Sequence, residues 1–183
     1  MRSAQEFLHL SSKQLLQELK RGHAIAPDAL ADREYKGTSL GLPGFIERLT
    51  WKKFKKTFHQ DPKRGVLRGW NVRLEQNALH EPCVPLQKRG TAVTFGHYHV
   101  LSPNGHRVPA GCDRGLLIHY GFGKKGPLDI AGRVRDPLVA VNPGDAGLLL
   151  GWSYLDVGLL LGTPSFFTLE LDCALTEVVE PPG

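Results

Sequence analysis

The sequence contains little cysteine and no recognisable targeting segment. Its three cysteines, Cys83, Cys112 and Cys173, are odd in number and lie far apart, whereas a structural zinc site needs closely spaced thiolate pairs. The first residues, MRSAQEF, lack the apolar core of a signal peptide. The apolar run 147–162 carries an aspartate and is too short for a membrane span. We therefore expect free thiols and a cytoplasmic location.

The common catalytic signatures are also missing. The chain has no G-x-S-x-G, no H-E-x-x-H and no phosphate-binding loop, which argues against the usual serine hydrolases, zinc proteases and nucleotide-binding enzymes. Cys112 follows His99 by thirteen residues, so a Cys/His nucleophile stays open, although an idle thiol is the more common case. The sequence leaves enzymatic activity undecided.

Glycine and proline, in contrast, are abundant, with 21 and 13 residues that concentrate after residue 90. Short alternating runs separated by turn residues are typical of antiparallel strands. No helical pattern interrupts these runs, which argues against parallel βαβ units. We predict a mainly β protein in which residues 61–183 form a small antiparallel, lipocalin-like β-barrel, with a β-sandwich as the competing architecture. The clearest runs are 69–74, 91–101, 116–120, 136–141, 148–154 and 165–172.

Residues 1–60 are expected to form an N-terminal helical segment in front of the barrel. Ser3 with Glu6, and Ser11 with Gln14, have the spacing of capping boxes, and Gly22 is a suitable stop. A further helix is predicted from Pro43, with apolar residues at helical spacing up to residue 49. Residues 51–58 fit either a helix or a strand.

Several segments resemble a known family. Arg33-Glu-Tyr-Lys-Gly37, Leu42-Pro-Gly and Trp51-Lys-Lys-Phe54 are similar to the opening of the uncharacterised GXWXG-type bacterial proteins. Those proteins pair a G-x-W-x-G stretch with a downstream domain of unknown function, and residues 135–172 resemble that domain in the order of their motifs. The resemblance implies a lipocalin-like barrel and supplies no established activity.

The stretch 91–120 carries four of the eight histidines. Strict alternation would place His97 and His99 on one face with Val93, Phe95 and Leu101, which are bulkier than the residues between them. Because the bulkier apolar face is normally the buried one, we predict that both imidazoles point into the barrel.

A ligand pocket is mostly apolar with a few placed polar groups. We therefore predict a binding protein that holds a small lipophilic ligand, an anionic one included, inside the barrel. The predicted ligand-contacting residues are Trp70, Phe95, His97, His99, His119, Tyr120, Trp152, Tyr154 and Phe167. An ordinary packed core would use similar aromatic residues.

Two alternatives use the same residues for chemistry. His97, His99 and His119 could make a three-imidazole zinc or iron site with an open position, although no acidic partner for the imidazoles is evident nearby in the sequence. Histidine with tyrosine could instead catalyse isomerisation, cyclisation or hydrolysis of an apolar substrate. The leading prediction includes neither a metal nor another cofactor.

Lys52, Lys53, Lys55 and Lys56 account for much of the net charge of +5. Such a cluster can attract an anionic surface, whereas a solvated face is the simpler interpretation. A third functional class is therefore an interaction module that uses these lysines and the N-terminal helices. No nucleic-acid-binding motif accompanies the cluster.

Overall fold

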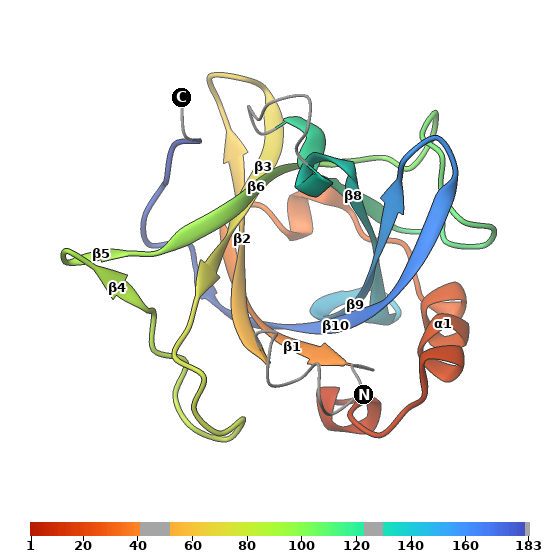
Figure 1. Ribbon diagram of the computed structural model, residues 1–183, viewed down its shortest axis with the longest axis horizontal. Coiled ribbons are helices and arrows are strands. Elements are labelled where there is room, and N and C mark those ends of the chain that lie inside the picture. The colour runs from red at the N-terminus through yellow and green to blue at the C-terminus, as the bar shows by residue number, and fades with distance from the viewer. Residues whose placement is uncertain (41–51, 123–129, 182–183) are drawn as a thin grey trace.

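The alternating runs of the sequence form strands that close into a barrel (Figure 1). The computed structural model describes residues 1–40, 52–122 and 130–181. The barrel strands are β1 (Arg33–Leu40), β2 (Lys53–Asp61), β3 (Val66–Arg73), β6 (Thr94–Leu101), β7 (Leu116–His119), β8 (Val134–Asn142), β9 (Asp145–Asp156) and β10 (Leu160–Ala174). A separate small hairpin consists of β4 (Gln87–Lys88) and β5 (Thr91–Ala92).

Each barrel strand pairs with two neighbours, in the order β1-β10-β9-β8-β7-β6-β3-β2. Strand β1 is antiparallel to both β2 and β10, so the circle is closed and the eight barrel strands have no free edge. The predicted antiparallel barrel is confirmed at this level. A closed barrel of about eight strands has an interior that side chains nearly fill, with room for one small ligand.

The barrel begins earlier in the chain than the sequence predicted. Strand β1 and nearly all of β2 lie within residues 1–60, so the helical segment expected there ends before Arg33. Residues 53–58 are strand rather than helix, because Phe54 and Phe58 face the interior and contact its core. The helix expected from Pro43 lies outside the described residues.

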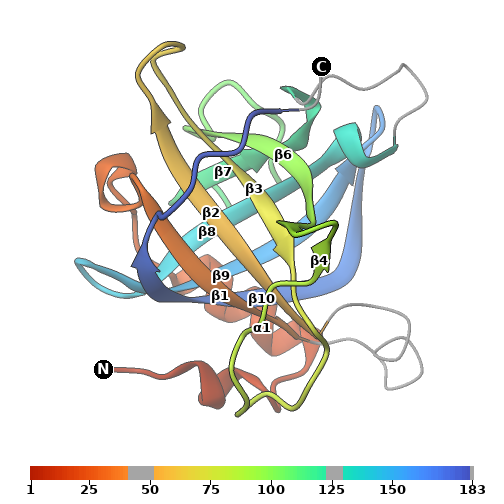
Figure 2. The ribbon, with the colours of Figure 1, turned by 90° about the vertical axis from the view of Figure 1, so that its left-hand side faces the viewer.

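The N-terminal segment contains one α-helix, α1 (Ser12–Arg21), and the short 3-10 turns η1 (Ala4–Phe7) and η2 (Pro27–Ala29). The prediction of several N-terminal helices was thus overstated, because apolar residues recur at helical spacing only through α1. Both predicted capping boxes are present, and the Gln14 amide donates to Ser11 Oγ at 3.4 Å. The turn η1 and the helix α1 lie against the outside of the barrel (Figure 2).

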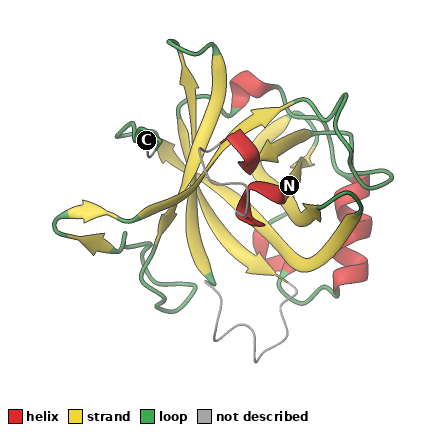
Figure 3. Cartoon of the chain, turned by 45° about the horizontal axis from the view of Figure 1, so that its top comes forward, coloured by secondary structure: helices red, strands yellow, loops and turns green. Residues whose placement is uncertain are grey.

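The apolar residues form two cores. One fills part of the barrel interior, where Ile25 and Leu30 from the chain before β1 join the strand residues. The other lies outside the barrel, where Phe7, Leu15 and Leu19 pack on the outer faces of β8 to β10. Near α1, both faces of the barrel wall are therefore covered by apolar side chains. Strands make up most of the molecule, as Figure 3 shows.

A bulge in β6 changes which of its residues face inward. Phe95 pairs with Asn71 and Tyr98 pairs with Gly69, so three steps along β6 match two along β3. Gly96 adopts φ +54°, which is a left-handed conformation that glycine accepts without strain. The bulge lets both Phe95 and Tyr98 face the interior, although they stand an odd number of residues apart.

Candidate functional site

The barrel contains a cavity of ≈ 480 Å³ between the interior core and the end opposite Ile25 and Leu30. Its lining includes residues from the C-terminal parts of β1 and β9 and from the N-terminal parts of β2, β6 and β8. The lining residues are Ser39, Phe54, Lys56, Asn71, Phe95, Gly96, Tyr120, Ala131, Val134, Asp136, Ser153, Pro164, Ser165 and Phe167.

Aromatic rings form much of the cavity wall. The Phe167 ring lies across Gly151 of the neighbouring strand, where any β-carbon would overlap the ring. Phe54 packs edge-on against Phe167, with the ring centroids 5.9 Å apart. Because Gly151 lets Phe167 lie flat against the wall, space remains in the middle of the barrel.

Lys56, Asn71, Tyr120 and Asp136 meet at the inner end of the cavity, and we call these four residues the polar floor. The Lys56 Nζ donates to Asn71 Oδ1 at 2.9 Å and to the Tyr120 hydroxyl at 2.5 Å. The Tyr120 hydroxyl in turn donates to Asp136 Oδ2 at 3.0 Å, and Lys56 Nζ lies 3.5 Å from the same oxygen. The floor is thus one connected network.

The polar floor is buried, and burial changes its acid–base properties. The side chains of Lys56 and Asp136 are only 3% and 2% exposed. Desolvation lowers the pKa of Lys56 and raises the pKa of Asp136, because both charged forms lose water. Desolvation also raises the pKa of Tyr120 well above its usual value. Asp136 Oδ1 accepts no hydrogen bond from the described residues.

Aromatic rings surround the Lys56 amine. Its nitrogen lies 4.9 Å from the Tyr98 ring centroid, 5.1 Å from that of Tyr120 and 5.2 Å from that of Phe167. Ring faces attract a cation within about 6 Å, most strongly where water is excluded. The rings therefore compensate part of the desolvation of the ammonium group.

The strand pattern explains how charged residues came to lie inside. Lys56 stands midway between Phe54 and Phe58 on β2, so period-two alternation turns it inward with both phenylalanines. Asp136 shares the inner face of β8 with Leu138 in the same way. Lys56 was not predicted to face the cavity, because the four lysines at positions 52, 53, 55 and 56 were interpreted as one exposed cluster.

Three predicted ligand-contacting residues line the cavity: Phe95, Tyr120 and Phe167. Phe95 lies on β6 before the bulge, Tyr120 follows β7, and Phe167 belongs to β10. Residues far apart in the chain are thus brought together as the sequence analysis expected.

His97 and His99 do not line the cavity, and the prediction that they point into it was wrong. The His97 ring lies beside Trp70, with centroids 6.0 Å apart, and Trp70 also stays outside the cavity lining. His99 stacks on Phe122 at 4.7 Å. The cause is the bulge at Gly96, which shifts the alternation by one residue and turns Tyr98 inward instead.

The three histidines proposed as metal ligands are not gathered. His119 is the cross-strand partner of His99, as expected for neighbouring strands, but His97 lies with Trp70. Burial lowers the pKa of His119 to about 4. In the described ranges, the one group of three donors within metal-binding reach is Glu34, Asp172 and Cys173. Lys55 already binds two members of that group.

Trp152 and Tyr154 belong to the outer core rather than to the cavity. The Trp152 Nε1 donates to Thr163 O at 2.7 Å, and the Tyr154 hydroxyl donates to Arg107 O at 2.6 Å. Both side chains are nearly inaccessible. Their predicted ligand contact is therefore replaced by a packing role.

The four lysines have different surroundings and do not form one patch. Lys53 is buried, and its Nζ donates to Asn77 Oδ1 at 2.5 Å and to three backbone carbonyls. Lys55 bridges Glu34 and Asp172 at 2.9 Å each. Lys56 lies in the polar floor. Binding of these lysines to an anionic surface stays a prediction, with fewer solvated amines than the sequence suggested.

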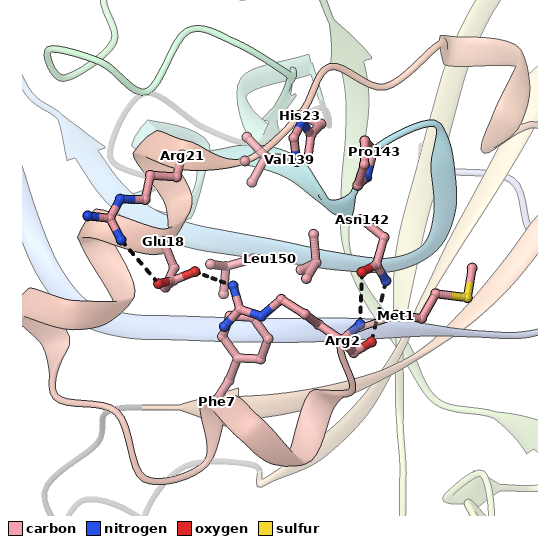
Figure 4. Close-up of a pocket in the computed structure, with 12 residues that line it drawn as sticks. Met1, Arg2, Phe7, Glu18, Arg21, His23, Val139, Asn142, Pro143 and Leu150 are labelled. Atoms are coloured by element: carbon pink, nitrogen blue, oxygen red, sulfur yellow. Dashed lines mark hydrogen bonds and ion pairs between the residues drawn. The ribbon is translucent and has the colours of Figure 1, made fainter.

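A second cavity, of ≈ 410 Å³, lies between the N-terminal segment and β8 (Figure 4). Its charged residues bind one another: Glu18 accepts from Arg2 and is also close to Arg21. The Arg2 amide donates to Asn142 Oδ1 at 2.9 Å. These contacts tie the N-terminus to the barrel, and the space between them is a by-product of that attachment.

Comparison with protein-family models, with curated proteins and with solved structures found no match. The resemblance to the GXWXG-type proteins stays a prediction. Within the described part of the chain, no helix has the length and apolar character needed to cross a membrane.

Proposed function

We propose that the barrel binds one small lipophilic molecule that carries a single polar group. The observation behind this proposal is the ≈ 480 Å³ cavity with aromatic walls and a buried polar floor. Ligand pockets of proteins usually measure about 300–1,000 Å³ and combine apolar walls with few polar groups. A lipocalin-like barrel would have the same function.

The polar floor favours a neutral head group. Lys56 and Asp136 bring opposite charges within 3.5 Å of each other, so the floor carries no net charge when both are ionised. Asp136 Oδ1 is buried and accepts no hydrogen bond from the described residues, so a donor group of a ligand could satisfy it. A carboxylate ligand would face this oxygen unless Asp136 took up a proton. We therefore prefer an alcohol or a carbonyl compound to the anionic ligand that the sequence left open.

The ligand test compares three probes of one chain length: decane, decanol and decanoate. Each competes with a fluorescent apolar dye, and native mass spectrometry of protein purified without added ligand detects any retained molecule. We expect decanol to bind most tightly, because only it can satisfy Asp136 Oδ1 without adding charge. Equal affinity for all three probes would show that the polar floor does not contribute to ligand selection.

A cavity-filling variant locates the binding. Ser153 lines the cavity, whereas Glu170 on β10 is exposed. Ser153→Trp should abolish decanol binding, and Glu170→Trp should leave it unchanged. Unchanged binding in folded Ser153→Trp would show that the ligand binds elsewhere.

The histidine-based alternatives have less support than the binding function. His97 and His99 are absent from the cavity lining, and the metal alternative needs three imidazoles in one place, whereas His97 lies apart from His99 and His119. The reactive group that does line the cavity is the amine of Lys56, not an imidazole.

A further inference from the structure

Lys56 places a primary amine at the inner end of an apolar cavity. The barrel interior around Lys56 and Asp136 is lined largely by apolar side chains, so burying an ion pair there costs desolvation free energy. Replacing such a pair with apolar residues of similar volume is often neutral or stabilising. A lysine and an aspartate that face a cavity together therefore call for a chemical role as well as a structural one.

We propose that Lys56 forms a covalent imine with an aldehyde or ketone bound in the cavity. This inference rests on the proposed function, because the carbonyl compound would occupy the same space as the lipophilic ligand. It goes beyond that function, because it gives the barrel a reactive group and restricts its ligands to carbonyl compounds.

The polar floor can move the protons that imine formation requires. The ammonium of Lys56 must first lose a proton, and the Tyr120 hydroxyl connects its nitrogen to Asp136 through contacts of 2.5 and 3.0 Å. Burial favours this transfer, since it lowers the pKa of Lys56 and raises that of Asp136. The product is a neutral amine beside a protonated carboxyl group.

The covalent steps then balance without an added reagent. The amine lone pair attacks the carbonyl carbon, and the oxygen collects the two electrons of the C=O π bond. A proton shift gives a carbinolamine, Asp136 returns its proton to the hydroxyl, and water leaves as the C=N bond forms, which gives an iminium cation beside the Asp136 carboxylate. One carbonyl compound and the ammonium form of Lys56 thus give one iminium ion and one water, and loss of the N–H proton from the iminium leaves the neutral imine.

The surroundings of Lys56 also suit a charged imine. The iminium cation carries its charge near the nitrogen position, which lies about equally close to the ring centroids of Tyr98, Tyr120 and Phe167. These rings attract a cation regardless of its substituents. Asp136 supplies the counter-charge once it has lost its proton.

The test is reductive trapping with octanal and sodium cyanoborohydride at neutral pH. Reduction of the imine leaves a secondary amine, so the chain gains the mass of octanal less one oxygen atom. Peptide mapping should place this gain at Lys56. Exposed lysines have a pKa of about 10.4 and are only ~0.04% neutral at pH 7. Lys56 should therefore react about tenfold faster than any of them for each unit by which its pKa is lowered.

Two variants serve as controls. Lys56→Met/Asp136→Asn removes the amine and its partner together and should lose the selective adduct, and a cooperative unfolding transition shows that this variant is folded. Lys88→Met removes an exposed lysine of the small hairpin and should keep the adduct at Lys56. Raising the pH to 10 should abolish the selectivity, because exposed amines then become neutral as well.

The outcomes separate this inference from the proposed function. Octanol binding without any adduct at Lys56 would overturn the imine and leave the binding function standing. Absence of both octanol binding and the adduct would overturn both. An adduct at Lys56 that persists in Ser153→Trp would also overturn the inference, because the aldehyde would then reach the amine without occupying the cavity.

Discussion

Replacing Lys56 with methionine probes how the polar floor contributes to stability. The substitution keeps a long side chain between Phe54 and Phe58 but leaves the Asp136 carboxylate without its cation. Breaking a buried pair by removing one partner costs about 3–5 kcal/mol. We expect the lower end, about 3 kcal/mol, because Asp136 borders a cavity that water can enter. For a chain of this size that corresponds to a melting point lower by roughly 6–12 °C.

The pH dependence identifies the cause of the loss. Desolvation already raises the pKa of Asp136 in the folded protein, and removal of Lys56 raises it further. A carboxyl group whose folded pKa lies above the unfolded value of about 3.9 stabilises least at high pH. The deficit of Lys56→Met should thus be small near pH 4 and grow as the pH rises through the folded pKa of Asp136.

Chemical denaturation of four proteins measures the coupling: the parent, Lys56→Met, Asp136→Asn and the double variant. The double variant should be more stable than Lys56→Met, because it leaves no unpaired charge in the barrel. The free energies of unfolding come from denaturant midpoints at constant m-value. A Lys56→Met protein as stable as its parent at pH 8, or additive losses in the double variant, would refute the reasoning.

Two further predictions concern β6 and its neighbour β7. Gly96→Ala should destabilise the protein by about 1–2 kcal/mol or more in denaturant titrations, since φ +54° is unfavourable for alanine and its Cβ would lie 2.8 Å from Asn71 Nδ2. Gly105→Ala shares the positive φ but meets nothing within 4 Å, so it should cost less, and equal losses would remove the role of the close contact. The ring of His119 should titrate in NMR spectra with a midpoint of about 4. Because the unfolded value is about 6.5, its contribution to stability is present above that pH and is lost as the pH falls; a midpoint near 6.5 would contradict the burial of this ring.

Local sequence patterns were sufficient for much of the secondary structure. The alternating runs after residue 65 predicted antiparallel strands, because side chains of a strand point to opposite faces and only one face is apolar. The spacings Ser3–Glu6 and Ser11–Gln14 predicted the starts of η1 and α1, since a capping box needs only four consecutive residues. Phe95 and Phe167 could be assigned to the cavity wall because they are large apolar residues of predicted strands, and Tyr120 could be assigned as a polar group of the cavity because it ends the run 116–120.

The faces of β6 could not be assigned in the same way. A single extra residue at Gly96 reverses the alternation, and a bulge is specified by pairing with Asn71 and Gly69 rather than by β6 itself. Trp152 and Tyr154 were misplaced for a related reason. Both side chains belong to the outer core, and they donate to the carbonyls of Thr163 and Arg107, contacts that the alternation of β9 does not specify.

The polar floor depends most completely on tertiary structure. Lys56, Asn71, Tyr120 and Asp136 come from four separate parts of the chain, and none carries a local motif. The alternation of β2 was enough to pair Lys56 with Phe54 and Phe58 once that run is taken as a strand. Only closure of the barrel brings Asp136 to within 3.5 Å of its amine and removes the water around both. Burial and proximity, which set the acid–base behaviour of the site, are properties of the folded barrel and not of any one strand.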